Sequence, residues 1–339
     1  MTVATGLYGS LISVVLPARA TEATLFHAAL ESVLAQTYTN FELLVVDDGL
    51  SPETLAVPIL ADPRARVVKN RGAGLVDALN TGVDCAKGEL VARMDADDIC
   101  HPERFERQVD QMERRGLDIA ATGVEVFGPN GRGEGYEIYE RWINALVEPD
   151  HIAREIFIES PLPHPTVMMR TQALRKLGGY RDMGWPEDYD LWLRAMEAGY
   201  VMGKAPQTLL RWRDTHGRAS RTDQRYSRRN FSRAKAHFLA RTALKGKKAV
   251  IWGAGQTGGM LARYLEEEGC AIRAFIDIST RRIGKTKRGR PVFAPEEAGR
   301  VAKDELILGA VPARGARLLI REYLWSLGKT EGRDFFLAA

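Results

Sequence analysis

Several features that mark secreted and membrane proteins are scarce or missing in this chain of 339 residues. There are only three cysteines, Cys85, Cys100 and Cys270, and none forms a C-x-x-C pair, which argues against a disulfide framework and a zinc site. No apolar run is long enough to cross a membrane, and the first residues lack the basic segment of a signal peptide. We therefore expect a cytoplasmic protein in a reducing compartment.

An excess of one charge is also absent. The net charge is only +4, so the composition gives no reason to expect a nucleic-acid partner. The apolar fraction of 45% and the charged fraction of 27% are ordinary for a soluble globular protein. We find no internal repeat, and the length predicts about two domains, each large enough for its own core.

The most informative segment is 90–98, Leu-Val-Ala-Arg-Met-Asp-Ala-Asp-Asp, where a short apolar run ends in Asp95, Asp97 and Asp98. Carboxylates this close repel one another unless a cation neutralises them. Mg²⁺ and Mn²⁺ prefer oxygen ligands and often bind through carboxylates together with substrate phosphates. The segment therefore indicates metal-assisted nucleotide chemistry, the alternative being a solvated loop with turn-forming aspartates.

Strands and helices alternate through the first hundred residues. The expected strands are 11–16 (closed by Pro17), 41–46, 67–68 and 89–94, and the expected helices are 22–36 and 75–86. Such alternation is typical of an α/β fold with a mostly parallel sheet covered by helices. Asp47 and Asp48 follow the second strand, so they share the carboxyl edge of the sheet with the acid cluster, and ligands bind at that edge.

The pattern is looser between residues 100 and 215. The expected elements are a helix at 102–115, a strand at 119–127, a Gly-rich loop at 128–135, a β-like run at 166–170 and a helix opening near Pro186. Residues 221–248 then contain ten Lys or Arg and one acid. We expect a basic helical linker there, which lies in solvent between domains or contacts anionic lipid.

A second, smaller α/β unit is expected from residue 248. A strand at 249–252 leads into Gly253-x-Gly255-x-x-Gly258 and a helix at 259–268, and Asp277 follows the next strand, 271–276. In this context the glycines and the acid match a dinucleotide-binding fingerprint. The unit is a nucleotide- or sugar-binding accessory domain or a purely structural module. The predicted domains are 1–220, the linker 221–247 and the Rossmann-like unit 248–339.

Ordered motifs in the first 220 residues resemble those of family 2 glycosyltransferases with the GT-A fold. The motifs are Ser13–Pro17, Ser32–Tyr38, Phe41–Gly49, Ala78–Asn80, Gly88–Asp98, Pro102–Arg104, His164–Arg170, Glu187–Arg194 and Arg213-x-x-His216-x-x-x-Ser220. The resemblance implies a GT-A nucleotide-diphospho-sugar transferase fold and sugar transfer with inversion from a nucleotide donor, first of all a UDP-sugar. It also implies a saccharide or lipid-linked acceptor, polysaccharide or glycan synthesis, and Mg²⁺ or Mn²⁺.

The resemblance assigns roles to individual residues. Donor-nucleotide binding is assigned to Pro17, Asp47, Asp48, Arg71, Asp95 and Asp97. Metal binding is assigned to Asp97, Asp98 and His216, and diphosphate binding to Arg211 and Arg213. The candidate bases are Asp188 first and Glu187 second. The division of roles within the acid cluster stays open. As alternatives to these roles, residues 186–188 would also suit a helix N-terminus. Residues 47–49 would also suit an Asx turn.

Three other functions compete with sugar transfer. One is a binding or scaffold protein with an inactive transferase fold, against which the intact acid cluster and residues 187–188 argue. A sugar-nucleotide pyrophosphorylase needs a Gly-rich basic loop after its first strand, and residues 16–20 contain no glycine. An NAD-dependent oxidoreductase or nucleotide-sugar-binding protein would act through Gly253, Gly255, Gly258 and Asp277, but no catalytic residues follow that fingerprint. The donor sugar, the acceptor and the oligomeric state stay open.

Overall fold

The computed structural model describes residues 6–128, 134–215 and 218–339, with the backbone alone at 134, 219 and 220. The chain divides into two compact units. The first unit comprises 1–152, 161–183 and 187–218, and the second comprises 153–160, 184–186 and 219–339. Each unit has its own sheet.

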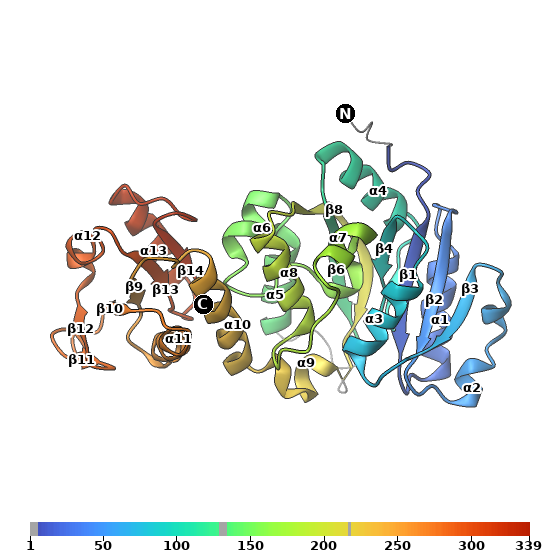
Figure 1. The fold of residues 1–339 in the computed structure, drawn as a ribbon, viewed down its shortest axis with the longest axis horizontal. Coiled ribbons are helices and arrows are strands. Elements are labelled where there is room, and N and C mark those ends of the chain that lie inside the picture. Colours follow the sequence, from blue (N-terminus) through green and yellow to red (C-terminus); the bar gives the residue numbers. More distant parts are fainter. Residues whose placement is uncertain (1–5, 129–133, 216–217) are drawn as a thin grey trace. The chain divides into compact units, whose positions relative to one another are not determined.

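The first unit is built on an eight-stranded sheet in the order β3-β2-β1-β4-β7-β6-β8-β5. Its strands are β1 Ile12–Ala18, β2 Phe41–Asp47, β3 Ala65–Lys69, β4 Leu90–Arg93, β5 Ile99–Cys100, β6 Ile119–Phe127, β7 Met168–Arg170 and β8 Met202–Arg213. The strands β1 to β4 are parallel where they pair with one another, and β6 is parallel to β8 (Figure 1). The antiparallel strands are β7, between β4 and β6, and β5, beside β8.

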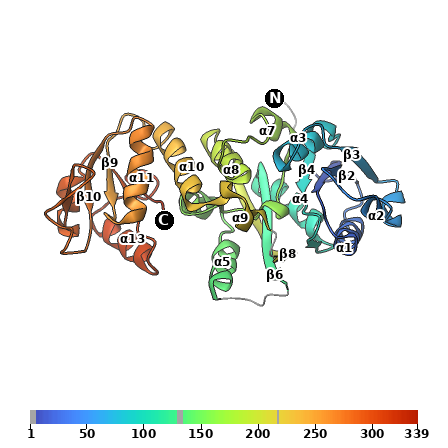
Figure 2. The same cartoon turned by 90° about the horizontal axis from the view of Figure 1, so that it is seen from below.

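Helices cover both faces of this sheet. They are α1 Ala23–Leu34, α2 Pro52–Leu55, α3 Leu75–Cys85, α4 Arg104–Arg115, α5 Glu134–Ala145, α6 Pro149–Glu155, α7 Thr171–Lys176 and α8 Glu187–Glu197, with short 3-10 helices at Pro58–Ala61 and His164–Thr166. Figure 2 shows α1 and α3 on opposite faces. The strand β1 is buried on both faces, so it is apolar throughout apart from Ser13. Val14 packs in the core with α1 and α4, whereas Val15 faces α3 at Gly82. A Cβ at Gly82 would lie 2.3 Å from Val15 Cγ1, so the glycine permits this close approach.

These elements confirm the predicted fold class and most predicted elements. The strand at 119–127 has the predicted bounds. The first strand is longer than predicted: it continues through Pro17 to Ala18, because Pro17 pairs in register with Val46 inside the parallel ladder. The long strand β8 and the helix α5 were not predicted. Residues 129–133 of the predicted loop lie outside the described residues, and its last two residues, 134 and 135, already belong to α5.

The second unit contains a six-stranded sheet in the order β11-β12-β10-β9-β13-β14. Its strands are β9 Ala249–Trp252, β10 Ile272–Ile276, β11 Thr286–Lys287, β12 Arg290–Phe293, β13 Leu306–Gly309 and β14 Phe335–Leu337. Its helices are α9 Ala219–Thr222, α10 Arg228–Arg241, α11 Gln256–Glu267, α12 Ala298–Val301 and α13 Ala316–Ser326, with short 3-10 helices at Gln224–Tyr226 and Pro295–Glu297. All its pairings are parallel except that of β11 with β12.

The basic segment 221–248 forms α9, a 3-10 turn and α10 rather than one continuous helix. The helix α10 packs against α11. Lys235 of α10 is buried and donates to the carbonyl oxygens of Ile158, at 2.7 Å, and Ala338, at 3.0 Å. Part of the basic segment is therefore structural. In the part of the chain that the structure describes, no helix combines the length and apolarity needed to cross a membrane.

Candidate active site

The acid cluster lies just after β4, where the carboxyl ends of β1 and β4 meet. Asp95, Asp97 and Asp98 each offer a carboxylate oxygen within 4.8 Å of the others. Asp98 is 1% exposed, and its Oδ1 accepts a 2.7 Å hydrogen bond from the Arg213 backbone N–H. Its Oδ2 is buried without a hydrogen-bond partner in the described residues. An orphaned carboxylate oxygen of this kind is costly and calls for a ligand.

The electrostatics of the cluster favour a cation. Burial, and secondarily the charge of Asp95, raise the pKa of Asp97 to about 6. Burial raises the pKa of Asp98 well above its usual range, with further contributions from Asp95 and Asp97. The protein itself therefore leaves this negative charge undercompensated. Three convergent carboxylates and an unpaired buried oxygen fit Mg²⁺ or Mn²⁺, which prefer oxygen ligands.

Arginines from β8 and the segment after it surround the cluster. The Nε of Arg213 donates to the carbonyl oxygen of Asp97 at 2.7 Å, and the positive charge of Arg218 lowers the pKa of Asp97. The guanidinium of Arg213 stacks on the Phe127 ring at 4.5 Å. Arg211 stacks on the same ring at 4.4 Å. His216 lies outside the described residues, so its predicted metal role stays a prediction.

The residues predicted to bind the donor nucleotide lie at the ends of β1 to β3. Asp48 accepts from the side-chain amide of Asn70 at 2.7 Å and from the Gly74 backbone N–H at 3.1 Å. Asp47 accepts from the backbone N–H groups of Gly49 and Leu50, at 2.9 and 2.8 Å, so it forms the turn that the sequence allowed as an alternative. Asp48 is thus held in place beside a glycine-containing loop.

Two further residues of the predicted donor site have different surroundings. Pro17 is buried within β1, next to Val46. The guanidinium of Arg71 pairs with Asp84 of α3 at 3.2 Å, and its side chain is 64% exposed. Their contacts with a donor stay predictions.

The candidate bases open helix α8. Glu187 is 1% exposed, and its Oε1 lies 3.8 Å from Nδ1 of His164. Asp188 is only half-buried, and its Oδ1 accepts from the Tyr189 backbone N–H at 2.7 Å. Asp190 pairs with Arg194, one helical turn further along α8, at 2.6 Å. Asp188 is the more accessible of the two candidate bases.

Arg93 links the acid cluster to the surroundings of the candidate bases, and the sequence reasoning missed it. Its Nη2 lies 2.5 Å from Asp95 Oδ1, while Nε and Nη1 are buried without partners in the described residues. The positive charge of Arg93 disfavours protonation of His164 and favours ionisation of Tyr180. His164 Nε2 and Tyr180 Oη lie 3.0 Å apart. Burial first, and Arg93 second, keep the pKa of His164 well below its usual range. His164 is therefore neutral.

The glycines of the second unit shape a tight turn between β9 and α11. A Cβ at Gly258 would lie 1.8 Å from the carbonyl oxygen of Gly253, so only glycine fits there. Gly253 itself has a φ of 119°. Asp277 accepts from the backbone N–H groups of Ala254 and Ser279, both at 2.8 Å. Asp277 thus holds the turn, and its predicted contact with a nucleotide stays a prediction, as does that of Gly255.

The large sheet, with helices on both faces and carboxylates at its carboxyl edge, places the first unit among the GT-A glycosyltransferases. The family model "Glycosyl transferase family 2" matches residues 13–178. All of these residues belong to the first unit except 153–160, which belong to the second. The protein described as "Putative glycosyltransferase EpsE" of Bacillus subtilis (strain 168) is 32% identical to this chain over 229 residues, which cover 65% of this chain and 78% of that protein. The chain belongs to glycosyltransferase family 2 and is a transferase enzyme.

Two further comparisons agree with this assignment. The amylovoran biosynthesis glycosyltransferase AmsE of Erwinia amylovora is 32% identical over 193 residues, which cover 54% of this chain and 68% of that protein. Among solved structures, S. aureus TarS 1-349 in complex with UDP-GlcNAc matches with a TM-score of 0.54 at 19% identity, covering 75% of this chain and 71% of that one. At that identity the structural match supports the fold.

Proposed function

We propose that the first unit is an inverting, metal-dependent glycosyltransferase that uses a nucleotide-diphosphate sugar. The observation that carries the proposal is the buried Oδ2 of Asp98, which has no hydrogen-bond partner in the described residues and belongs to a cluster of three carboxylates. A UDP-sugar is the first donor class to test, and the acceptor is a hydroxyl of a saccharide or lipid-linked saccharide. Because AmsE is named for amylovoran biosynthesis, we place the reaction in polysaccharide synthesis.

The donor would lie along the carboxyl edge of β1, β2 and β4. Asp48 would bind the nucleotide base, and its carboxylate is held by Asn70 and the Gly74 N–H. Asp97 and Asp98 would hold Mg²⁺ or Mn²⁺, with Asp95 fixed by Arg93 at their side. When bound, the ion would neutralise negative charge that develops on the leaving diphosphate.

The arginines beside the cluster supply charge of the right sign for the diphosphate. Arg213 is fixed by its bond to the Asp97 carbonyl oxygen, and Arg218 lies close enough to act on the Asp97 carboxylate. Guanidinium groups in fixed positions stabilise phosphate charge without reorganising during the reaction. Arg211 would contribute from the same face of β8.

Asp188 would act as the general base. Its carboxylate takes the proton from the acceptor hydroxyl while the acceptor oxygen bonds to the anomeric carbon. The bond from that carbon to the phosphate oxygen breaks, and its electron pair leaves with the nucleoside diphosphate. Attack opposite the leaving group inverts the anomeric configuration. Glu187 is the weaker candidate because it is buried against His164.

The donor site can be tested without a known acceptor. Ligands that bind only the native state raise the melting temperature. We expect Mn²⁺ to enlarge the stabilisation produced by one nucleoside diphosphate among UDP, GDP, dTDP and CDP, and this Mn²⁺-dependent shift reports the donor site. Asp97→Asn should abolish this shift, whereas Glu103→Gln, at the half-exposed start of α4, should keep it. An Mn²⁺-dependent shift that persists in Asp97→Asn would overturn the assignment of the cluster.

The base is tested separately, once the donor class and an acceptor have been identified. Asp188→Asn should lower kcat by about 100-fold or more while the Mn²⁺-dependent shift with nucleotide remains. Glu103→Gln again serves as the matched control. Turnover at the wild-type rate in Asp188→Asn would show that another group takes the proton.

The location of the acceptor gives the basic segment 221–248 a further possible role. If the acceptor is lipid-linked, exposed cations of this segment would attract an anionic membrane surface. Arg228 and Arg241 are candidates, whereas Lys235 is committed to the core of the second unit. Pelleting with vesicles that contain phosphatidylglycerol, compared with neutral vesicles, tests this contact.

A further inference from the structure

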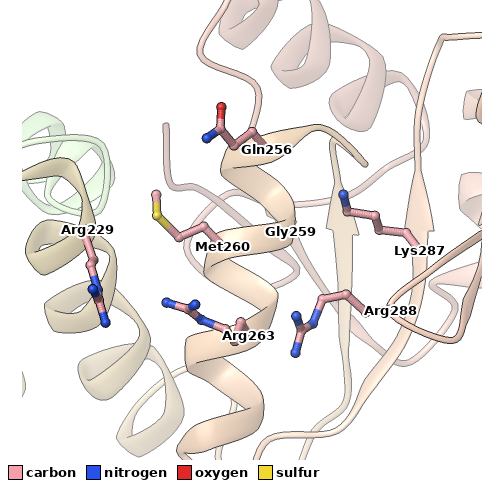
Figure 3. Close-up of a pocket in the computed structure, with 7 residues that line it drawn as sticks. All are labelled: Arg229, Gln256, Gly259, Met260, Arg263, Lys287 and Arg288. Atoms are coloured by element: carbon pink, nitrogen blue, oxygen red, sulfur yellow. The ribbon is translucent and has the colours of Figure 1, made fainter.

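The second unit has a basic pocket that the transferase chemistry does not use. The pocket has a volume of about 530 Å³ and is lined by Arg229, Gln256, Gly259, Met260, Arg263, Lys287 and Arg288 (Figure 3). We refer to these seven residues as the basic pocket. Its volume lies in the range of sites for small organic ligands.

Three separate elements bring the cations together. Arg229 comes from α10, Arg263 from α11, and Lys287 and Arg288 from the end of β11 and the turn after it. Gln256, Gly259, Met260 and Arg263 follow one another at helical spacing, so they form one flank of α11 (Figure 3). The pocket is thus built by the packing of the unit and is not a run of charge on one surface helix.

Acids compensate only part of this charge. Arg288 pairs with Glu266 at 2.6 Å, and Arg263 lies 3.5 Å from Glu267. No carboxylate lies within 4.0 Å of the charged groups of Arg229 or Lys287 in the described residues. The basic pocket therefore retains uncompensated positive charge.

Two of the guanidinium groups meet at one oxygen atom. The Nε of Arg229 donates to the Tyr264 hydroxyl at 2.8 Å, and Nη2 of Arg263 donates to the same oxygen. The Nε of Arg263 is buried and makes no hydrogen bond in the described residues, although Glu267 Oε1 lies 3.5 Å from it. Like charges repel at such separations, and a neutral phenol does not neutralise them. An anion bound between the two guanidinium groups would neutralise their charge.

Lys287 adds positive charge where the helix dipole is already positive. A Cβ at Gly259 would lie 2.8 Å from Lys287 Cε and 3.3 Å from its Nζ, so the ammonium group lies over the first turns of α11. Helix N-termini favour anions and disfavour cations. The glycine provides the space for Lys287, and the combined field favours a negatively charged group nearby.

The turn that carries Arg288 has an unusual conformation. Arg288 and Gly289 have φ values of 50° and 71° and join β11 to β12 as a tight two-residue turn. Such turns favour Asn or Gly at the first position, and an arginine there is strained. The strained conformation keeps Arg288 against Glu266, at the rim of the basic pocket.

We propose that the basic pocket binds a soluble organic diphosphate, such as a nucleoside diphosphate, at a site separate from the transferase donor site. The charge of two or more units on a diphosphate matches the uncompensated cations, and bidentate arginine contacts suit phosphate oxygens. The apolar Met260 side chain provides a wall for the organic group. This inference goes beyond the proposed function and does not depend on it.

Calorimetric titration of the full chain tests the proposal, with inorganic pyrophosphate and UDP as probes. The Asp97→Asn background with EDTA removes metal-dependent binding at the donor site. We expect both probes to bind in this background, and Arg263→Ala with Lys287→Ala to weaken binding by at least about tenfold. The charge-matched control is Arg300→Ala with Lys303→Ala, two exposed residues outside the pocket, and it should bind like the parent.

Lys287→Gln covers the case in which the double variant fails to fold, because the Lys287 side chain has no hydrogen bond in the described residues. This single variant should fold normally and bind the probes more weakly. The proposal is overturned by unchanged affinity in Lys287→Gln, by an equal loss in the control, or by no binding in the Asp97→Asn background. It is also overturned if only phosphatidylglycerol vesicles bind through these residues, since the surface would then recognise lipid. Donor-site failure appears separately, as a missing Mn²⁺-dependent shift in the wild type.

Discussion

Lys204 of β8 allows a quantitative prediction about stability. Its side chain is fully buried, and its Nζ donates to the Ile143 carbonyl oxygen, with no carboxylate within ion-pair distance in the described residues. Burial lowers the pKa of Lys204 from 10.5 to about 7. Because the unfolded chain keeps the ordinary value, unfolding takes up a proton between pH 7 and 10.5. This residue therefore makes the protein more stable as the pH rises through that window.

The magnitude follows from the two pKa values. One pH unit corresponds to about 1.4 kcal/mol, so the full penalty at and below pH 7 is about 4 to 5 kcal/mol as an upper bound. Lys204→Met removes the penalty and keeps the length of the side chain, but it also removes a hydrogen bond worth about 1 kcal/mol. After discounting for local relaxation, we expect Lys204→Met to be more stable at pH 7 by about 1 to 3 kcal/mol.

The assay is calorimetric unfolding at several pH values between 6.5 and 9.5, because the two units can unfold in separate transitions. The advantage of Lys204→Met should shrink steadily as the pH rises. Lys87→Met, at an exposed position of the same unit, should show no such trend. A variant that is less stable than the wild type at pH 7, by an amount independent of pH, would refute the reasoning about burial.

Three further substitutions test other features of the first unit. Gly82→Ala should lower the free energy of unfolding by about 1 to 3 kcal/mol in urea titrations, because the new methyl group collides with Val15, a stiff side chain. Asp190→Asn should cost about 3 kcal/mol in the same titrations, since it leaves the buried guanidinium of Arg194 without its anion; a loss below about 0.5 kcal/mol would contradict this. Arg93→Lys keeps the charge but not the planar fork, so kcat should fall at least about tenfold with little change in melting temperature; an unchanged kcat would argue against a positioning role.

Local sequence pattern was sufficient where a segment's own residues decide its structure. The strands at 119–127 and 249–252 have the predicted bounds, because predominantly apolar runs bounded by turn residues suit buried strands. The pairing of Asp190 with Arg194 also depends only on helical spacing. The acid cluster could be located because its three carboxylates lie within residues 95–98, directly after a short apolar run.

The local sequence pattern was insufficient where contacts with distant segments decide whether a segment forms a strand or lies near the acid cluster. The strand β8 contains Lys204, Pro206 and two arginines, and it is a strand because β6 and β5 pair with its two edges. That pairing brings Arg213 and Arg218 to the acid cluster, more than 100 residues away along the chain. Arg93 was missed because an arginine at the end of a buried strand is recognisable as a neighbour of the candidate site only once Asp95 and Tyr180 are seen beside it.

The division of the chain into units has a consequence for how this enzyme could be shortened or recombined. The boundary between the units is crossed at five places, after residues 152, 160, 183, 186 and 218. A chain cut near residue 220 would retain Phe157 without Phe336, its ring partner at 5.6 Å, and Glu155 without Arg321. The second unit thus cannot be removed by cutting the chain at one point. A single cut would divide this unit between two fragments, and each fragment would expose surface that is buried in the intact unit.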